Sequence, residues 1–590
     1  MIHRCALVTA LVAQVACASA VRPNDADVSE RSTDAASDLV SLDVEIPRTD
    51  VPWDYGVDAS DDFPSADHPD IDVRTDAGPI CQRPITEAGV AIPAPRPIAP
   101  LSPFRLSSRR PTLRWALASG VRGACVDVCA RRSCDTPMMT LEAIGDRVRT
   151  PTELPPGPIF WRLRGIAGED VGSATSRVWQ FHVRARSSPN ESSLGPIVDV
   201  NGDGYADVIG STAVPRTITV SHGGPSGPPA AAYVDVPETN SQIVSAGDMN
   251  GDGFGELVIG DARLRNVQRP YVWRGTPRGL VDPMYWPLEG ENVESYVTSA
   301  VGDMDGDGYA DLVIGQPGTL RRVQTYFGSP TGPIAGVAIS APMTEQGEWA
   351  SSIAGVGDVN GDGRGDFLVG YQGQGAMDTA APVALYLGSA ALRTGPPPVP
   401  DALLMPPPDA LRFGTRIWNA GDVNGDGLTD ALISGFTRSD GFVELRLGSS
   451  SGLAASRVRL VAPDDRWVFP MGYDASAAHD VNGDGFDDVL IPLEVRTDSG
   501  APLARIQLYL GNERGLDPPT AILAANIYVS DASCHGVGDI NGDGFDDIVF
   551  KFAGPFGAVP NIGRMYWLAG TPGVIGPRMD LGASCYDFAH

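Results

Sequence analysis

A nine-residue acidic segment that recurs seven times constrains the fold of this 590-residue chain more than any other feature. The first copy runs from Asp199 to Asp207, and later copies begin at residues 248, 303, 358, 422, 480 and 539. Successive copies start 49 to 64 residues apart, and a regular period in that range marks a repeat architecture built from small supersecondary units. We therefore expect seven similar structural units in succession.

The residue types of the segment point to a metal loop. Each copy has Asp at position 1, Asn or Asp at 3, Asp at 5 and Asp or Glu at 9, with glycine at 4 and 6. Ca²⁺ takes six to eight oxygen ligands, so it suits a tight loop that turns alternate side chains inward and adds a backbone carbonyl, here assigned to position 7. The glycines allow positive φ. Asn-Gly and Asp-Gly also mark plain hairpin turns, but seven copies that keep every acidic position favour metal.

We expect up to seven Ca²⁺, one per loop. The residue at position 9 is expected to be bidentate in the third loop (Asp311), the longer Glu256 closes the second loop, and Arg364 contributes only its carbonyl. The predicted metal ligands are Asp199, Asn201, Asp203, Tyr205 and Asp207; Asp248, Asn250, Asp252, Phe254 and Glu256; Asp303, Asp305, Asp307, Tyr309 and Asp311; Asp358, Asn360, Asp362, Arg364 and Asp366; Asp422, Asn424, Asp426, Leu428 and Asp430; Asp480, Asn482, Asp484, Phe486 and Asp488; Asp539, Asn541, Asp543, Phe545 and Asp547.

The residues around each loop predict strands. An EF-hand would lie between helices and close with Glu at position 12, whereas here the loop runs into apolar segments such as Leu312-Val313-Ile314, which read as buried strands. Each unit also carries a second strand that ends in a glycine turn, such as Tyr326-Phe327-Gly328. Units of about 57 residues suit four-stranded blades, and seven blades close a ring without exposed sheet edges. The predicted fold class is all-β, a seven-bladed β-propeller over residues 186–590 preceded by a small β-sandwich.

The two ends of the repeat region suggest how the ring closes. The segment Asp531 to Cys534 precedes the last loop, the similar segment Gly582 to Cys585 has no loop after it, and the first unit lacks a strand before Asp199. We therefore expect residues 574–590 to complete the first blade, with a disulfide between Cys534 and Cys585 as an unproven clamp.

The N-terminal 80 residues are predicted to be an export signal and a spacer. Basic residues, an apolar stretch over residues 6–16 and Ala18-Ser19-Ala20 fit a secretory signal over residues 1–20. Cleavage before Cys17 with lipidation of that cysteine is the alternative, and either event exports the protein. Residues 21–80 hold 16 acidic residues and four arginines, a composition that predicts a disordered acidic linker.

Residues 81–185 are predicted to form a small β-sandwich. Short segments that alternate with period two begin at Thr112, Cys125, Phe160 and Val178, and four or more such strands in about 100 residues are typical of a sandwich. Trp115 and Trp161 are expected in its core.

The six cysteines outside the signal are expected to form three disulfides in an exported chain, with Cys129 bonded to Cys134. A zinc site at Cys125, Cys129 and Cys134 is the alternative.

These patterns resemble known families. The sandwich segment is similar to a fibronectin type III or immunoglobulin-like module. The seven loops and Phe413-Gly414 resemble the FG-GAP/VCBS repeats of the integrin α N-terminal propellers, over residues 195–590. The resemblance implies a propeller fold and Ca²⁺ at the Asp-x-Asp/Asn-x-Asp-Gly-x-x-Asp loops. It implies far less about the ligand.

The net charge of −29 disfavours nucleic acid and anionic membranes as partners, so membrane attachment is expected only through a lipid on Cys17. Catalytic motifs are few. Residues 448–452 match G-x-S-x-G without the strand-to-helix context that the motif requires, and the histidines do not cluster at ligand spacing. We therefore predict no enzyme, but a noncatalytic protein, secreted or at the outer cell surface, that binds or adheres to an extracellular protein or glycan.

Two alternatives to the binding function remain open. A polysaccharide-acting enzyme of the propeller lyase type would need a cluster of His, Tyr, Arg and carboxylate side chains on one face of the propeller. A propeller lectin would expose Trp286, Trp349 or Trp467.

Overall fold

The computed structural model describes most of the chain after residue 79. The described residues are 80–82, 92–101, 105–106, 108–184, 193–194, 197–212, 218–228, 232–234, 243–264, 267–280, 285–287, 297–317, 320–342, 348–372, 381–438, 441–460, 475–496, 502–525, 532–552, 564–572, 574–583 and 586–588. The predicted signal, Cys17 and the acidic linker lie outside them. No helix in these ranges is long and apolar enough to cross a membrane.

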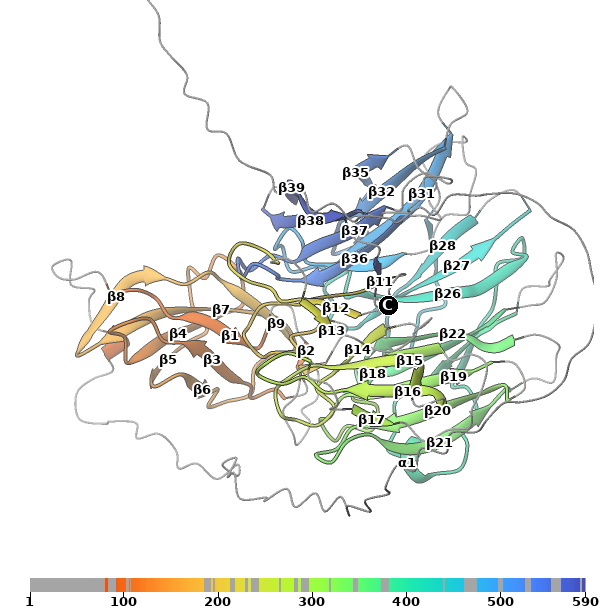
Figure 1. Ribbon diagram of the computed structural model, residues 1–590, viewed down its shortest axis with the longest axis horizontal. Coiled ribbons are helices and arrows are strands. Elements are labelled where there is room, and N and C mark those ends of the chain that lie inside the picture. The colour runs from red at the N-terminus through yellow and green to blue at the C-terminus, as the bar shows by residue number, and fades with distance from the viewer. Residues whose placement is uncertain are drawn as a thin grey trace, which may run out of the picture. The chain divides into compact units, whose positions relative to one another are not determined.

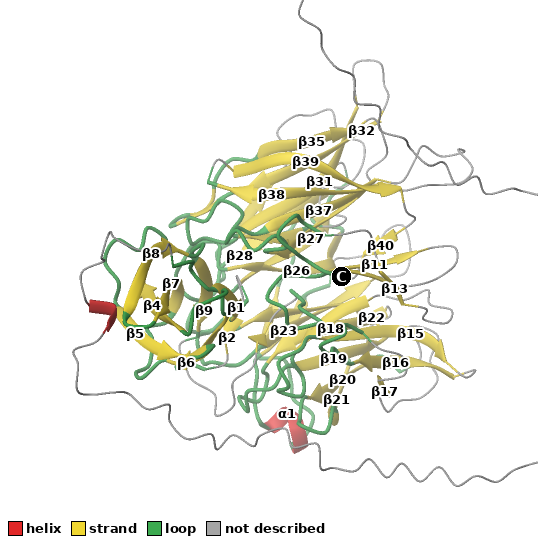
Figure 2. Cartoon of the chain, turned by 60° about the vertical axis from the view of Figure 1, so that its left-hand side comes forward, coloured by secondary structure: helices red, strands yellow, loops and turns green. Residues whose placement is uncertain are grey.

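The first domain comprises two antiparallel-rich sheets (Figures 1 and 2), β1-β3-β6 and β10-β2-β9-β7-β4-β5, with β8 paired to β7. Its elements are the 3₁₀ turn η1 (Ile80–Gln82), β1 (Arg96–Ala99), β2 (Arg105–Leu106), β3 (Thr112–Ala116), β4 (Gly123–Cys129), β5 (Met139–Ile144), β6 (Arg147–Arg149), β7 (Gly157–Ala167), β8 (Asp170–Thr175), β9 (Trp179–Val183) and β10 (Ser193–Leu194). The predicted strand segments are confirmed.

The core of the first domain is aromatic. Trp115 and Trp161 are 1% and 0% exposed, so both predicted core positions are confirmed. Trp161 meets Trp179 edge to face, with ring centroids 6.2 Å apart, an arrangement that adds to the burial energy of each ring.

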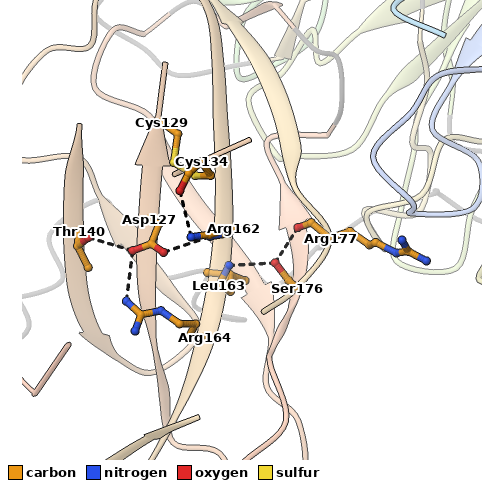
Figure 3. The surroundings of a disulfide bond; sticks show 9 residues. All are labelled: Asp127, Cys129, Cys134, Thr140, Arg162, Leu163, Arg164, Ser176 and Arg177. Carbon is orange, nitrogen blue, oxygen red and sulfur yellow. Dashed lines mark hydrogen bonds and ion pairs between the residues drawn. A yellow bond between two sulfur atoms is a disulfide. The ribbon is translucent and has the colours of Figure 1, made fainter. Parts of the chain in front are cut away.

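Two disulfides fasten the first domain, Cys81–Cys125 and Cys129–Cys134. The second pairing was predicted, and together the two bonds exclude zinc at these cysteines. Figure 3 shows the buried Asp127 beside the second disulfide, where it accepts hydrogen bonds from Thr140, Arg162 and Arg164. Cys534 is buried in the last repeat unit, and Cys585 lies outside the described residues, so their bridge stays a prediction.

After the first domain, the described residues contain seven four-stranded antiparallel sheets in succession (Figure 1), as expected for propeller blades. Their strands are β11 (Val208–Thr212), β12 (Ile218–Ser221) and β13 (Ala232–Val234); β14 (Ile243–Gly247), β15 (Glu256–Leu264), β16 (Val267–Trp273) and β17 (Tyr285–Pro287); β18 (Val297–Gly302), β19 (Asp311–Gln316), β20 (Arg322–Phe327) and β21 (Ile334–Ser340); β22 (Glu348–Gly357), β23 (Asp366–Gln372), β24 (Val383–Tyr386) and β25 (Ala402–Leu404); β26 (Arg412–Gly421), β27 (Asp430–Phe436), β28 (Gly441–Arg446) and β29 (Val458–Leu460); β30 (Ser476–His479), β31 (Asp488–Arg496), β32 (Pro502–Tyr509) and β35 (Thr520–Ala525); β36 (Ala532–Gly538), β37 (Asp547–Phe552), β38 (Arg564–Thr571), β39 (Val574–Ala583) and, in the first sheet, β40 (Tyr586–Phe588).

Two small additions accompany these sheets. A hairpin of β33 (Gly511–Asn512) and β34 (Gly515–Leu516) lies in the sixth unit, and the helix α1 (Ala391–Thr394) lies in the fourth.

The last residues of the chain divide between two sheets. Strand β40 pairs with β11 and takes the place in the first sheet that β14 or β18 takes in its own sheet. Strand β39 pairs instead with β38, as the outer strand of the seventh sheet. The prediction that residues 574–590 all complete the first sheet is therefore wrong for 574–583. Residues 574–583 supply the fourth strand of the seventh sheet, and only residues 586–588 pair with the first sheet.

Buried side chains join each sheet to its neighbours. Along β19, Leu312 and Ile314 pack with the second sheet, whereas Val313 packs with the fourth. Successive side chains of a strand point to opposite faces, so a strand buried on both faces is apolar at every position. The first and seventh sheets also pack together, because Val208 of β11 lies in one buried cluster with Val549 of β37 and Trp567 of β38.

Candidate metal centres in seven repeated loops

The aspartate at position 1 organises each loop from within. Its Oδ2 accepts the N–H of the glycine at position 6 in all seven loops, at 2.7 to 3.1 Å. In the fourth loop Asp358 also accepts from Gly361 and Asp362, at 2.7 and 3.1 Å. The glycines at positions 4 and 6 have φ between 66° and 101°, which glycine adopts without a steric penalty. The predicted turn through positive φ is confirmed.

The acidic residue at position 9 ties its loop to the strand that follows. One oxygen accepts the N–H of position 2 in every loop, at 2.6 to 3.1 Å. In six units the other oxygen accepts the N–H of the glycine in the turn after the next strand, as Gly328 donates to Asp311 at 2.8 Å. A Cβ on Gly328 would lie 2.5 Å from the carbonyl oxygens of Ala310 and Met249, so this turn admits only glycine.

The side chains at positions 3 and 5 complete the ring of oxygens. Each Asp at position 5 accepts the N–H of position 7, as Asp362 accepts from Arg364 at 2.9 Å. In the first, second, fourth, fifth and sixth loops the side-chain amide of the Asn at position 3 donates to the same aspartate, as Asn424 donates to Asp426 at 2.9 Å. The amide oxygen of Asn424 in turn accepts the N–H of Asp426 at 3.1 Å, so the oxygens that a cation would use also hold the backbone of the loop.

The third loop brings its acids closest together. Ligand oxygens of Asp303, Asp305 and Asp311 all lie within 4.8 Å of one another, and Asp303 and Asp311 are fully buried. Burial, reinforced by the charges of Asp305 and Asp303, raises the pKa of Asp311 well above its ordinary value. Three carboxylates crowded out of water need a compensating cation, and an all-oxygen donor set suits a hard ion such as Ca²⁺.

Burial also raises the pKa of carboxyl groups in the other loops. Burial raises the pKa of Asp199 to about 8 and that of Asp248 and Asp539 to about 7. It also raises the pKa of the position 9 residues Glu256, Asp366, Asp488 and Asp547 well above the ordinary range. The residues of the third loop thus fit a divalent cation, and a cation in each of the other six loops stays a prediction. The full set of ligands, including the carbonyls of position 7, stays a prediction.

Sequence reasoning missed the role of the side chain at position 7. The ring of Tyr309 lies over Gly251 at position 4 of the preceding loop, where a Cβ would come within 2.7 Å of it. The same contact links Gly202 with Phe254, Gly306 with Arg364, Gly361 with Leu428, Gly425 with Phe486, Gly483 with Phe545 and Gly542 with Tyr205. The series returns from the seventh loop to the first. The sequence did contain a signal for this contact, because glycine stands at position 4 and a large residue at position 7 in every copy.

A backbone hydrogen bond links the same pairs of neighbouring loops. The N–H of position 8 donates to the carbonyl of position 1 in the preceding loop, as Gly365 donates to Asp303 at 2.7 Å. The remaining bonds are Ala206 to Asp539, Gly255 to Asp199, Ala310 to Asp248, Thr429 to Asp358, Asp487 to Asp422 and Asp546 to Asp480, at 2.9 to 3.3 Å. Each loop is therefore bonded to the loop of the next sheet, and the first loop to the seventh.

Arginines meet several of the loops. Arg393, in α1, forms ion pairs with Asp305 and Asp307 of the third loop, each at 2.9 Å. That loop alone has Asp rather than Asn at position 3, so it carries one more negative charge.

Four further arginines come from the first domain or its end. Arg96 donates to the carbonyl of Asp203 at 2.7 Å. Arg105 forms an ion pair with Asp487 at 3.3 Å, and Arg184 lies 3.6 Å from Asp303. Arg132 contacts the sixth and seventh loops. The first domain thus supplies positive charge to a surface that the acidic loops make negative.

Two other expectations concern side chains outside the loops. Residues 448–452 form a turn in which Ser449 Oγ donates to the carbonyl of Gly452 at 2.6 Å, as Ser329 does to Gly332, so the G-x-S-x-G match lies in a turn between two strands. Trp349 is 4% exposed. The lectin alternative, which needs this side chain at the surface, is therefore wrong about Trp349. Trp467 lies outside the described residues, and only the backbone of Trp286, in β17, is described.

The comparisons with known proteins agree with this geometry. A family model described as FG-GAP-like repeat matches residues 303–369 and 480–550, which contain the third, fourth, sixth and seventh loops. Phosphatidylinositol-glycan-specific phospholipase D of Bos taurus is 30% identical over 191 residues, 28% of this chain and 22% of that protein. Integrin alpha-IIb of Mus musculus is 30% identical over 221 residues, 33% of this chain and 20% of the integrin. The human protein of that name is 31% identical over 214 residues, 33% and 19% of the two chains.

This chain therefore spans about a fifth of the length of these relatives. Among solved structures, the crystal structure of AofleA from Arthrobotrys oligospora aligns with 59% of this chain and 88% of its own, at 13% identity and a TM-score of 0.32. A likeness of that size carries no argument about fold or function.

Proposed function

We propose that this chain, which carries FG-GAP-like repeats distantly similar to the integrin alpha N-terminal propeller region, is an exported, noncatalytic binding protein. Its seven sheets close into a seven-bladed β-propeller over residues 186–590, preceded by a β-sandwich over residues 81–185. The propeller holds up to seven Ca²⁺. The observation that carries this proposal is the uninterrupted circle of loop contacts, in which Ala206 bonds to Asp539 and Tyr205 covers Gly542.

Calcium acts as a structural clamp in this proposal. In each loop the side chains of positions 1, 3, 5 and 9 hold the ion, with the carbonyl of position 7, and the bound ion neutralises carboxylates that burial makes costly. Since position 8 bonds to position 1 of the preceding loop, fixing position 1 also fixes the contact between neighbouring sheets. Calcium thus stabilises the ring at its seven junctions.

Export rests on chemistry in the first domain. Disulfides persist in oxidising compartments, and two of them fasten this domain. An export signal over residues 1–20, with either cleavage after Ala20 or lipidation of Cys17, is consistent with that location. The partner is an extracellular protein or glycan, bound by surface loops of a rigid scaffold, and neither nucleic acid nor a bare membrane suits the charge of −29.

Metal content and thermal unfolding of the full chain test the calcium proposal. We expect close to seven Ca²⁺ per chain after purification in millimolar calcium, and a large fall in Tm when calcium is removed, because an ion bound only by the folded state stabilises it. Negligible bound calcium with an unchanged Tm would contradict the proposal.

A separate experiment tests export and the absence of catalysis. Fractionation of the native cells should place the protein outside the cytoplasm, and incubation with a panel of acidic and neutral glycans should give no products. Turnover of any glycan would establish the polysaccharide-acting enzyme instead, and retention in the cytoplasm would overturn export.

A further inference from the structure

The third loop has a carboxylate oxygen where the other loops have an amide nitrogen. In the fifth loop, Oδ1 of Asn424 accepts the N–H of Asp426 at 3.1 Å, and Nδ2 of Asn424 donates to Oδ2 of Asp426 at 2.9 Å. In the third loop Asp305 stands at this position, and its Oδ1 likewise accepts the N–H of Asp307 at 3.2 Å. A carboxylate cannot donate. Oδ2 of Asp307 therefore cannot receive from position 3 the hydrogen bond that the asparagine amide supplies in the fifth loop.

Arg393 supplies donors at this place from the neighbouring unit. Its Nε lies 2.9 Å from Oδ2 of Asp305, and its Nη2 lies 2.9 Å from Oδ2 of Asp307. Two nitrogens of one guanidinium thus join positions 3 and 5, which the amide joins directly in the fifth loop. Charge-assisted hydrogen bonds of this kind are stronger than neutral ones. The side chain of Asp305 is only 5% exposed, so water and salt screen its charge weakly.

The charges of the third loop follow the same exchange. With Asn at position 3, a loop carries three carboxylates among positions 1, 3, 5 and 9, whereas the third loop carries four. The guanidinium of Arg393 adds one positive charge. The third loop and Arg393 together therefore have the same net charge at these positions as a loop with Asn.

A connection in the fourth unit brings Arg393 to the third loop. Residues 387–401 join β24 to β25 and contain α1. Leu392 of α1 is 3% exposed and lies in one buried cluster with Phe327 of β20. The guanidinium of Arg393 lies 5.0 Å from the ring centroid of Phe327, and its Nη2 donates to the carbonyl of Gly328 at 3.3 Å. The helix of the fourth unit thus packs on the third sheet, beside the third loop.

We propose that Arg393 is a positioning residue of the third loop, which takes the place of the missing asparagine amide, holds Asp305 and Asp307 together and offsets the additional carboxylate. The inference rests on the proposed function in that it takes the third loop as a calcium site. Without the guanidinium, only a bound cation can neutralise the fourth carboxylate. Arg393 therefore sets how strongly the third loop depends on calcium.

A double-mutant cycle on the full chain tests the proposal, with Tm measured in calcium and after its removal. Arg393→Ala should lower the Tm of the calcium-free protein by about 2–6 °C, since it leaves the carboxylates of Asp305 and Asp307 without their cation. In calcium the loss should be smaller, because the bound ion compensates the same charge. A loss of equal size under both conditions would overturn the link between Arg393 and calcium.

A second substitution separates this role from mere anchoring of α1. Asp305→Asn in the Arg393→Ala background should restore most of the lost Tm, because asparagine supplies the amide donor and removes the additional charge. An arginine that only anchored α1 on β20 would give the same loss with either residue at position 305, so absence of rescue would overturn the proposal. If Arg393→Ala does not fold, folding of the double variant is the rescue.

Arg274→Ala is the matched control. Arg274 lies 3.5 Å from Asp252, at position 5 of the second loop, and its side chain is 32% exposed, as is that of Arg393. The second loop keeps the amide bond from Asn250 to Asp252, at 2.9 Å. Arg274→Ala should therefore lower the Tm of the calcium-free protein less than Arg393→Ala does. An equal loss would show that any arginine beside a loop acts in this way, and would overturn the proposal.

The role of Arg393 and the proposed function fail separately. Bound calcium in the parent protein without rescue by Asp305→Asn would overturn the role of Arg393 and leave the proposed function intact. Absence of bound calcium in the parent protein would overturn the proposed function, whereas rescue in calcium-free buffer would still support Arg393 as the substitute for the amide.

Discussion

Arg132 of the first domain donates a hydrogen bond from Nε to the carbonyl of Gly483 in the sixth loop, at 2.8 Å. Its guanidinium also lies 4.6 Å from the ring centroid of Phe545, the position 7 residue of the seventh loop. One side chain thus contacts two neighbouring loops at their junction. Every loop has a carbonyl at this position, but only the fold of the first domain brings an arginine to these two loops.

Replacement of Arg132 by alanine should destabilise the calcium-loaded protein by about 1–3 kcal/mol, since it leaves the carbonyl of Gly483 without its charged donor. Thermal or denaturant unfolding measures the change. Arg147→Ala is the matched control, because Arg147 pairs with Asp146 in a half-exposed position, where ion pairs contribute little. An Arg132 variant as stable as the control would show that the contact does not hold the first domain.

Replacement of Asp311 by asparagine should have opposite effects with and without calcium. In calcium the variant should lose about one bound ion and part of its stability, because position 9 is a predicted ligand. In calcium-free buffer the variant should be as stable as the parent or more so, since it removes a carboxylate whose pKa burial raises. Metal analysis and Tm measure both effects. Destabilisation of equal size under both conditions would assign Asp311 a purely structural role.

The calcium-free protein should lose stability as the pH rises from 5 to 8. Burial raises the pKa of Asp199 to about 8 and that of Asp248 and Asp539 to about 7, from 3.8. A carboxyl whose pKa is higher in the folded chain contributes stability that is complete below about pH 4 and is lost as the pH rises through the folded-state value. Tm of protein dialysed free of calcium measures this trend.

Calcium should reverse that pH dependence. Metal ligands bind the ion only when deprotonated, so the gain in Tm from a fixed calcium concentration should grow from pH 5 to pH 8. A Tm of the calcium-free protein that increased over this interval, or a gain from calcium that shrank, would contradict the assignment of these carboxylates.

Two glycine-to-alanine substitutions should differ sharply in cost. A Cβ at Gly328 would lie 2.5 Å from two backbone oxygens, so Gly328→Ala must displace the backbone at a sheet junction and should cost several kcal/mol. Gly120, with φ of 79°, has open space where a Cβ would lie, with no other atom within 4 Å, so Gly120→Ala should cost about 1 kcal/mol from backbone strain alone. Unfolding free energies measure both, and similar costs would show that the turn at Gly328 can relax.

The repeated parts of the fold were predictable, because repetition multiplies a weak local signal. A single Asp-x-Asn-Gly-Asp pattern suits a plain turn as well as a metal loop, but seven copies predict one repeated loop, and the apolar residues that follow each copy predict a strand. The core tryptophans of the first domain and the bond between Cys129 and Cys134 likewise followed from local sequence, since period-two strands and a short cysteine spacing constrain what lies near in the chain.

Contacts between distant segments were not predictable in the same way. Nothing local to Arg132 or Arg184 indicates that the guanidinium contacts a loop more than a hundred residues later. The division of the last strands between β39 and β40 also escaped prediction, because both segments alternate and either one satisfies the missing edge of the first sheet.

The pairing of β11 with β40 has a consequence for how the protein is made. Residues 208–212 leave the ribosome more than 370 residues before their partner strand at 586–588, so the first sheet must wait, one strand short, while the other six are synthesised. Domains usually fold as they emerge, but here the first sheet in the chain cannot be completed before the last residues are synthesised. An exported chain would have to pass almost whole through its translocation channel before the first sheet of the series acquires its last strand.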